Sequence, residues 1–377
     1  MSLANKLNFF MCSILSLLST ALVADIDSNA CNQPINEFTL ESEFQTFNPS
    51  NALSLVWLGI HTLDSTVKAD NLGNIVKLED SELEGKDKDS DADLLSFLEQ
   101  NQFKNSVMRE FERFNIRYVI TEHEGRSILV FRHTLGLKNW LSNFDYGLAS
   151  FDIEPALGEK IHHGFGHILS HIWPQLLSDV VNHTEKTGSL WIYGNSLGGA
   201  LGLLTTPSLV KNGVPIEQLY LTGTPKAASQ KWVEKAQELV ENVSIYRMLG
   251  EEDIIARLPV HRNNLHEFGQ AFRFPIQALN NAIGGLREKM KFDTLGQEVH
   301  LSPNQNYLLS SVEGTEEREA NYWLNLAERF KSVDLSFEGN REKLKQRWKI
   351  IETNLLNHQV RQPESGYACL LFKAVKE

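Results

Sequence analysis

The residues with the clearest chemical potential lie in the stretch 190–200, which reads LWIYGNSLGGA. An apolar run leads into Gly194-Asn195-Ser196-Leu197-Gly198, and small residues follow directly. A strand, a sharp turn that carries a serine and a helix form, in this order, a nucleophile elbow that lifts the serine hydroxyl out of the sheet. Glycines on either side of the serine allow backbone approaches that a Cβ atom would block. The stretch therefore predicts that Ser196 is a nucleophile.

A serine becomes an effective nucleophile only when a base removes its proton and an acidic group orients that base. On this fold the partners follow the serine in the order acid, then histidine. A strand predicted at 243–249 ends just before Asp253, and an acid in that place lies at the same sheet edge as the elbow. Asp253 is thus the candidate acid, with Glu251 and Glu252 as rivals in the same loop.

The composition is that of an ordinary globular protein. The chain has 377 residues, of which 42% are hydrophobic and 22% charged, enough to build a sizeable core. Its formal net charge is −12 and its isoelectric point about 5.5. An acidic chain of this kind is a poor candidate for binding nucleic acid.

Residues 1–24 have the pattern of a secretory signal peptide. Lys6 precedes the apolar run Leu7–Leu18, and small residues follow, with cleavage expected after Ala21 or Ala24. An uncleaved anchor or a buried N-terminal helix is the alternative. No later segment is long and apolar enough to span a bilayer, so we expect a secreted protein with no stable membrane insertion.

Two cysteines remain after removal of such a signal, Cys31 and Cys369, one near each end of the mature chain. In an oxidising compartment an even pair predicts a disulfide that joins the ends. The loop-entropy model puts the stabilisation from so long a loop at roughly 5 kcal/mol. Two unrelated thiols are the alternative.

Strands that alternate with helices predict an α/β fold with a largely parallel central sheet flanked by helices. The expected elements are a helix within 41–66, adjacent strands at 116–121 and 128–131, a helix at 155–182, a strand at 189–193, a helix closed by Pro207 and Gly213, and strands at 219–222 and 243–249 with a helix near 228–241 between them.

The chain divides into the signal at 1–24, a hydrolase domain at 25–312 and a C-terminal extension at 313–377. The extension has charged amphipathic helical patterns and a short β-like run at 367–375. We expect its helices to pack on the same domain, beside a lid or over the sheet edge. The acidic loop at 79–93 does not fit a calcium-binding EF-hand, because Ala92 and Leu98 occupy positions that need glycine and an acid.

Several separated stretches resemble the class 3 lipase family, the fungal-lipase-like branch of the α/β-hydrolases. The order of the motifs matches throughout about 115–310. They are Val130-Phe131-Arg132-His133-Thr134 with Asn139-Trp140-Leu141, His162-His163-Gly164-Phe165, Gly194-Asn195-Ser196-Leu197-Gly198-Gly199-Ala200, Gly223-Thr224-Pro225-Lys226, and Asp253-Ile254-Ile255-Ala256-Arg257-Leu258-Pro259.

The resemblance implies a triad of Ser196, Asp253 and a histidine. His300 in EVHLSP is the favoured base, because it resembles the family's His-Ser ending and is followed by Tyr307. His266 resembles a structural motif of the family, and His358 lies much farther along the chain; both remain candidates. No metal ion or organic cofactor is needed for this chemistry.

The resemblance also implies an oxyanion hole and a lid. The backbone N–H of Leu197 supplies one donor and Thr134 the second, while Trp140 and Leu141 lie where the family carries its lid or lid hinge. Ordinary core packing is the alternative for these two apolar residues. His133 replaces a glycine of the oxyanion loop, and Asn195 replaces the histidine that usually precedes the nucleophile.

We therefore expect a secreted serine ester hydrolase that cleaves acyl esters of lipids, like a triacylglycerol lipase, through an acyl-enzyme at a lipid–water interface. A phospholipase A1 or a small-ester carboxylesterase on the same scaffold is the first alternative. A non-catalytic lipid-binding or interaction protein with this fold is the second, because fold alone does not fix function.

Overall fold

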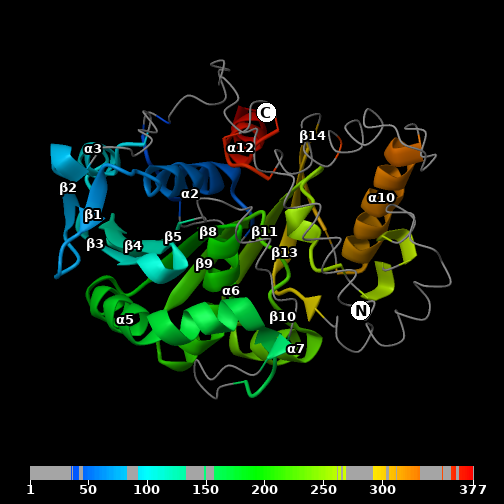
Figure 1. The fold of residues 1–377 in the computed structure, drawn as a ribbon, viewed down its shortest axis with the longest axis horizontal. Helices are drawn as coiled ribbons and strands as arrows, with labels where there is room; N and C mark the ends of the chain where they lie inside the picture. Colours follow the sequence, from blue (N-terminus) through cyan, green and yellow to red (C-terminus); the bar gives the residue numbers. More distant parts are fainter. Residues whose placement is uncertain are drawn as a thin grey trace.

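The computed structural model describes most of the chain between residues 35 and 376. The described residues are 35, 37–41, 46–82, 92–132, 148–149, 157–260, 262–264, 266–268, 292–302, 305–310, 312–331, 350, 358–361 and 365–376. Figure 1 shows helices on both faces of a twisted sheet, which confirms the predicted α/β architecture.

The central sheet has eight strands in the order β14-β13-β11-β9-β8-β5-β4-β3. The five strands from β5 to β13 are mutually parallel, while β3, β4 and β14 are antiparallel to their neighbours. Their bounds are β3 Lys104–Phe111, β4 Ile116–His123, β5 Arg126–Phe131, β8 Leu190–Asn195, β9 Ile216–Thr222, β11 Ser244–Gly250, β13 Gln297–Ser302 and β14 Gln305–Leu309.

One face of the sheet is covered by the three helices that connect its parallel strands. These are α5 (His163–Thr187), α6 (Leu197–Lys211) and α7 (Gln230–Leu239). Each connection moves in the same direction across the sheet, and crossovers between parallel strands are right-handed, so all three helices lie on one side. Their apolar side chains and the strand residues that face them form one half of the core.

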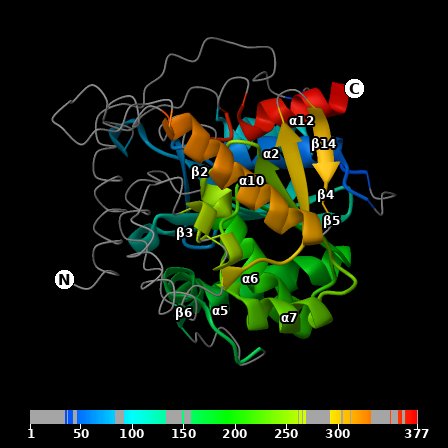
Figure 2. The same cartoon turned by 90° about the vertical axis from the view of Figure 1, so that its right-hand side faces the viewer.

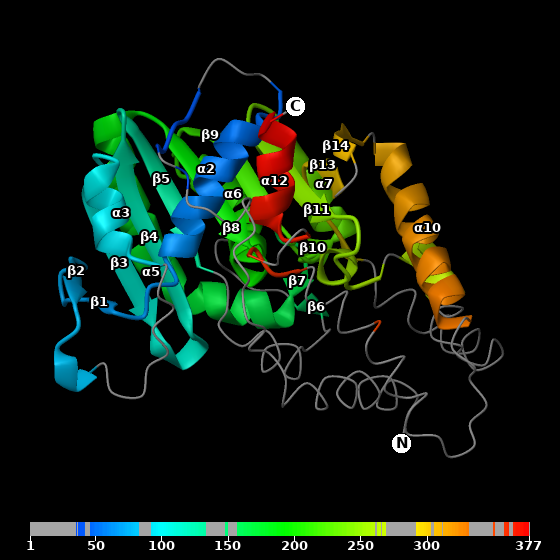
Figure 3. The same ribbon diagram turned by 90° about the horizontal axis from the view of Figure 1, so that it is seen from above.

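The other face is covered by helices from the two ends of the described chain. They are α2 (Pro49–His61), α3 (Leu94–Gln100) and α12 (Tyr367–Lys376). Figure 3 shows α2 and α12 side by side over the strands, and their side chains belong to one buried cluster. The C-terminal extension thus supplies part of the core of the domain.

The remaining elements are small and lie around this sandwich. They are the hairpin β1 (Val67–Ala69) and β2 (Ile75–Lys77), the four-stranded sheet β12 (Phe292–Asp293)-β10 (Ala228–Ser229)-β7 (Ile161–His162)-β6 (Leu148–Ala149), the single turns η2 (Asp80–Glu82), η3 (Glu112–Phe114), η4 (Ile255–Arg257) and η5 (Arg262–Asn264), and α10 (Val312–Lys331). Figure 2 shows α10 near β14, at the edge of the central sheet that β14 forms.

The predicted strands at 116–121, 128–131, 189–193, 219–222 and 243–249 and the predicted helix near 228–241 are confirmed within a few residues. The helix predicted at 155–182 is also present, but it begins at His163 and ends at Thr187. Two details of the prediction are wrong. Pro207 lies inside α6, which continues to Lys211 before Gly213 takes a left-handed φ of +79°. The segment 367–375 is helical, because its buried residues Tyr367, Leu370, Leu371 and Ala374 repeat at helical spacing.

The predicted signal peptide at 1–24 and the predicted disulfide partner Cys31 lie outside the described residues, whereas Cys369 is fully buried in α12. The cysteine pairing therefore stays a prediction. Among the described helices, none combines the length and the apolar character that crossing a bilayer requires.

The burial of α12 predicts unequal effects of two substitutions on one helix. Leu371 is fully buried, whereas Val375 is 39% exposed. Leu371→Ala should lower the free energy of unfolding by about 2–5 kcal/mol, because it leaves a cavity under the helix. Val375→Ala should change it by about 0.5 kcal/mol or less. Urea unfolding followed by tryptophan fluorescence measures both, and equal small effects would show that α12 adds nothing to the core.

Candidate active site

The elbow between β8 and α6 holds Ser196 in a strained backbone conformation. Its φ is 55° and its ψ −121°, a backbone conformation that residues other than glycine rarely adopt. The Ser196 N–H donates to the Thr222 carbonyl oxygen at 2.8 Å, and α6 begins at the next residue, Leu197. The Leu197 N–H is therefore one of the free donors at a helix start, where partial positive charge favours an anion.

Two glycines make the turn possible by removing a Cβ atom. A Cβ on Gly194 would lie 2.4 Å from the Gly198 carbonyl oxygen, and a Cβ on Gly198 would lie 2.5 Å from the Phe131 carbonyl oxygen. The second approach brings the end of β5 against the start of α6. β5 therefore ends beside the elbow. The predicted oxyanion residue Thr134 and the predicted lid residues Trp140 and Leu141 lie outside the described residues.

Asn195, the unusual residue before the nucleophile, has a structural role. Its side-chain amide donates to the Thr222 hydroxyl at 2.9 Å and to the Thr222 carbonyl oxygen at 3.2 Å. The Tyr193 hydroxyl lies 3.0 Å from the same threonine hydroxyl. Asn195 thus ties the strained turn to the neighbouring strand β9 by hydrogen bonds.

Asp253 lies where the sequence predicts, in the loop after β11, and its side chain is fully buried. Oδ1 accepts the N–H of Ile255 at 2.8 Å. Oδ2 accepts Nδ1–H of His358 at 2.8 Å and the hydroxyl of Tyr367 at 2.6 Å. An ionised carboxylate can only accept, so Nδ1 of His358 is the donor, and in the neutral imidazole Nε2 then presents a lone pair.

The environment of Asp253 keeps it ionised. Burial by itself raises the pKa of a carboxyl group, but here the charge of His358, the hydrogen bonds from His358 and Tyr367 and the charge of Arg257 outweigh burial and hold the pKa of Asp253 below its ordinary value. Burial and the neighbouring carboxylate raise the pKa of Tyr367 well above its ordinary value, so its phenol keeps the proton that it donates.

The structure places the predicted base His300 beside Glu298, whereas the histidine hydrogen-bonded to Asp253 is His358. His300 lies on β13, and its Nε2 is 3.0 Å from Oε2 of Glu298, two residues earlier on the same side of the strand. Val299 and Leu301 point the other way, into the core under α2 and α12. Burial raises the pKa of Glu298, but the hydrogen bond from His300 and the charge of Arg247 lower it to about 2. His300 therefore belongs to a buried ionic cluster.

The rival acids of the loop are used elsewhere. Glu251 accepts the hydroxyl of Ser302 at 2.6 Å, and Glu252 pairs with Arg329 at 2.9 Å. His266 lies in a helical turn with its side chain exposed.

Two buried polar atoms at the site make no hydrogen bond to any described residue, and they are the two that the chemistry requires. They are Oγ of Ser196 and Nε2 of His358, whose side chains are only 3% and 4% exposed. Gly223 lies against the hydrogen-bonded pair of His358 and Asp253: a Cβ there would be 2.8 Å from Cε1 of His358 and 3.0 Å from Oδ2 of Asp253. An imidazole supported by a carboxylate in this way can serve as the base for a serine nucleophile.

His358 and Tyr367 come from the C-terminal extension, for which the sequence predicts only packing helices. His358 is one of the three histidines that the sequence offers as the base, but its large separation from Asp253 along the chain makes it less favoured than His300. For Tyr367 no sequence pattern points to the acid.

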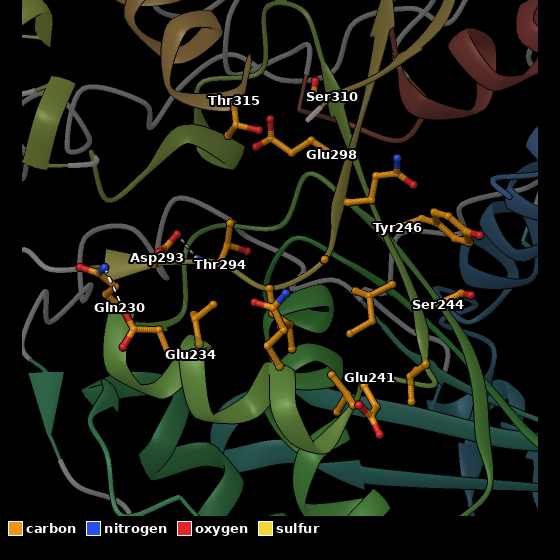
Figure 4. A pocket seen from close by; sticks show the side chains of 18 residues that line it. Gln230, Glu234, Glu241, Ser244, Tyr246, Asp293, Thr294, Glu298, Ser310 and Thr315 are labelled. Carbon is orange, nitrogen blue, oxygen red and sulfur yellow. Dashed lines mark hydrogen bonds between the residues drawn. The ribbon is translucent and has the colours of Figure 1, made fainter. Parts of the chain in front are cut away.

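A pocket of about 620 Å³ lies away from these residues. It is between α7, the beginning of β11 and the segment that leads into β13, and Figure 4 shows Glu234, Glu241 and Asp293 around it. Ser196, Asp253 and His358 do not line it. Because β11 reaches Asp253 only at its other end, this pocket is separate from the candidate active site.

Comparison with known proteins places the elbow and the acid in one family. Residues 128–263 match the family model described as lipase (class 3). No curated protein matches the chain.

Several solved lipases are similar to part of this chain at low identity. The native Rhizomucor miehei lipase propeptide complex is 19% identical over 54% of this chain and 58% of that chain, with a TM-score of 0.42. Lipase II from Rhizopus niveus is 16% identical over 55% and 70%, with a TM-score of 0.41. A triacylglycerol lipase from Penicillium expansum is 13% identical over 57% and 76%, with a TM-score of 0.44. This chain thus spans well under two thirds of the Rhizomucor miehei chain.

The contact at Gly223 yields a matched pair of substitutions. Gly223 and Gly213 both have left-handed φ angles, +59° and +79°, but nothing lies within 4 Å of a Cβ on Gly213. Both alanine variants bear the same backbone strain, about 1 kcal/mol, and only Gly223→Ala displaces the imidazole. Labelling of Ser196 by a fluorophosphonate should slow by about 10²-fold in Gly223→Ala and stay unchanged in Gly213→Ala. Equal labelling rates would remove His358 from the site.

Proposed function

We propose that this chain, which belongs to the class 3 lipase family through residues 128–263, is a serine ester hydrolase that cleaves acyl esters of lipids with Ser196, His358 and Asp253 as its triad. The single observation that carries the proposal is the hydrogen bond from Nδ1 of His358 to the buried carboxylate of Asp253. It leaves Nε2 as a free acceptor, and the Ser196 hydroxyl likewise has no partner among the described residues.

The mechanism follows from these positions. Nε2 of His358 takes the proton of Ser196 as Oγ attacks the ester carbonyl carbon. Asp253, ionised because of its low pKa, stabilises the imidazolium that forms. His358 then gives the proton to the leaving alcohol, and the acyl-enzyme remains. Water, deprotonated by the same imidazole, releases the fatty acid and restores Ser196.

The oxyanion of the tetrahedral intermediate needs hydrogen-bond donors. The N–H of Leu197, at the start of α6, is one of them. We assign the second to Thr134, which follows β5 by three residues in the chain, because β5 ends beside Gly198. The loss of one such donor typically costs about 3–4 kcal/mol of transition-state stabilisation. Trp140 and Leu141 follow Thr134 closely in the chain, and we propose that they belong to the lid over the site.

For the substrate we propose a water-insoluble acyl ester of the triacylglycerol type. The support is the match of residues 128–263 to the class 3 lipases, since lipases act on esters of this kind. We also propose that the protein is secreted after removal of residues 1–24 and that Cys31 and Cys369 form a disulfide. The sequence patterns at both ends of the chain support these two points.

The triad assignment predicts different outcomes at two histidines. Ser196→Ala and His358→Ala should each lower kcat/KM on a p-nitrophenyl ester by about 10⁴-fold or more. His300→Ala should leave kcat/KM within about threefold of the wild type, although loss of its hydrogen bond to Glu298 should lower stability by about 1 kcal/mol or more. Circular dichroism would verify that each variant is folded. Loss of activity in His300→Ala with full activity in His358→Ala would make His300 the base.

Substrate preference is decided by a direct comparison. A triolein emulsion, phosphatidylcholine vesicles and p-nitrophenyl butyrate should be offered to the same preparation, with Ser196→Ala as the blank. We expect the highest rate on triolein and a steep rise in rate once the ester exceeds its solubility, because the reaction then occurs at an interface. Highest turnover of phosphatidylcholine would identify a phospholipase. Vesicle binding without any turnover would identify a lipid-binding protein instead.

A further inference from the structure

The loop that carries Asp253 is shaped by one arginine. The buried guanidinium of Arg257 donates to three backbone carbonyl oxygens of the loop: Gly250 at 3.1 Å, Glu251 at 3.0 Å and Asp253 at a shorter distance. Both ends of the turn from β11 into η4 are thereby held by a single side chain. The position of the catalytic carboxylate therefore depends on where the Arg257 side chain lies.

Two contacts from α10 fix this arginine. The ring of Tyr322 lies under the guanidinium, with 4.1 Å between Cζ of Arg257 and the ring centroid, which is a cation–π contact. The backbone of Arg257 is held by Lys226, whose Nζ donates to the Arg257 carbonyl oxygen at 3.0 Å. The same Nζ lies 2.9 Å from Oε2 of Glu319, one turn before Tyr322 on α10.

The pair between Lys226 and Glu319 is fully enclosed. Both side chains are at least nine-tenths buried, and Oε1 of Glu319 accepts Nε1–H of the buried Trp323 at 3.4 Å. A buried ammonium group needs its counter-ion, so removal of Glu319 leaves an uncompensated charge next to the loop. Lys226 is then expected to move toward water and to leave the carbonyl oxygen of Arg257.

Two further polar contacts of α10 are peripheral. Glu252 pairs with Arg329, but both side chains are well exposed, so this pair contributes little. Glu316 binds Asn263 and Asn264 beyond the loop. The buried contacts at Glu319 and Tyr322 are therefore the part of α10 that can control the acid.

We propose that α10 is a clamp for the catalytic acid, with Glu319 and Tyr322 as positioning residues that act on Asp253 through Lys226 and Arg257. The proposal rests on the proposed function, because it assigns Asp253 to the triad. It gives a role to a helix that lies beyond the matched residues 128–263. A displacement of about 1 Å at a catalytic group can cost about 10²-fold in rate, so small movements of this loop are sufficient.

The test uses the full chain and separates positioning from stability. Glu319→Ala should lower kcat on a soluble p-nitrophenyl ester by about 10- to 100-fold with KM nearly unchanged, because substrate contacts are untouched. Tyr322→Leu, which removes the ring under Arg257, should lower kcat in the same way. Tyr322→Phe keeps that ring and should therefore have nearly the wild-type kcat. Glu317→Ala changes an exposed carboxylate on the same helix and is the matched control.

A double variant makes the distinction from a purely structural role. Lys226→Met with Glu319→Leu removes the buried charge pair, so the melting temperature should return toward that of the wild type. It does not restore the hydrogen bond to the Arg257 carbonyl oxygen, so kcat should stay low. Recovery of kcat together with stability would overturn the proposal, as would a folded Glu319→Ala variant with wild-type kcat.

A measurement independent of turnover keeps the clamp and the proposed function apart. The proton on Nδ1 of His358, shared with Asp253, should give a downfield ¹H NMR resonance that His358→Ala abolishes. Glu319→Ala should shift or broaden this resonance, and Glu317→Ala should not. An unchanged resonance in Glu319→Ala would refute the clamp even if no ester is hydrolysed, while absence of turnover or fluorophosphonate labelling in the wild type would refute the proposed function alone.

Discussion

A fully buried carboxylate must find its hydrogen-bond donors within the protein, and the structure around Asp253 is arranged to supply them. The donors are a backbone N–H of its own loop, the imidazole of His358 and the phenol of Tyr367. The last two lie more than a hundred residues away in the chain. Because an unpaired buried charge is so costly, the C-terminal segment has to return to the sheet edge for the domain to be complete.

The topology of the sheet explains how that return is possible. Successive right-handed crossovers in one direction place α5, α6 and α7 on one face and leave the other face uncovered. Segments before and after the parallel strands must cover it, and α2 and α12 do so. The helix that completes the second half of the core therefore begins at Tyr367, the residue that also binds the acid. Core packing and the support of Asp253 are thus two consequences of one docking event.

The nucleophile side of the site could be predicted from sequence because its determinants are local. The strand, the turn and the helix around Ser196 are contiguous, and Gly194 and Gly198 are required by contacts within that unit and with β5. The acid was predictable for a related reason, since any residue just after β11 must lie at the same edge as the elbow. The alternation of strands and helices and the order of the motifs along the chain both indicate this position of Asp253.

The base could not be predicted in the same way. Alternation along β13 puts His300 on the same face as Glu298, but it does not tell which histidine of the chain reaches Asp253. That choice depends on the path of the chain after β14. His358 and Tyr367 reach Asp253 through the tertiary packing of α12 on α2. No short-range pattern in the sequence predicts this packing. Residues 367–376 form a helix, not the predicted strand, because their buried apolar residues repeat at helical spacing and pack in one cluster with those of α2.

The two halves of the site consequently depend on different parts of the fold. Ser196 is held by its own elbow and by the hydrogen bonds of Asn195 to β9, so its strained φ persists wherever the parallel sheet is intact. Asp253 and His358 are held by α10 and α12, at the end of the chain. A loosening of the C-terminal segment would therefore leave a properly placed serine without an oriented base. The proposed activity therefore depends on the packing of the C-terminal helices as well as on the sheet.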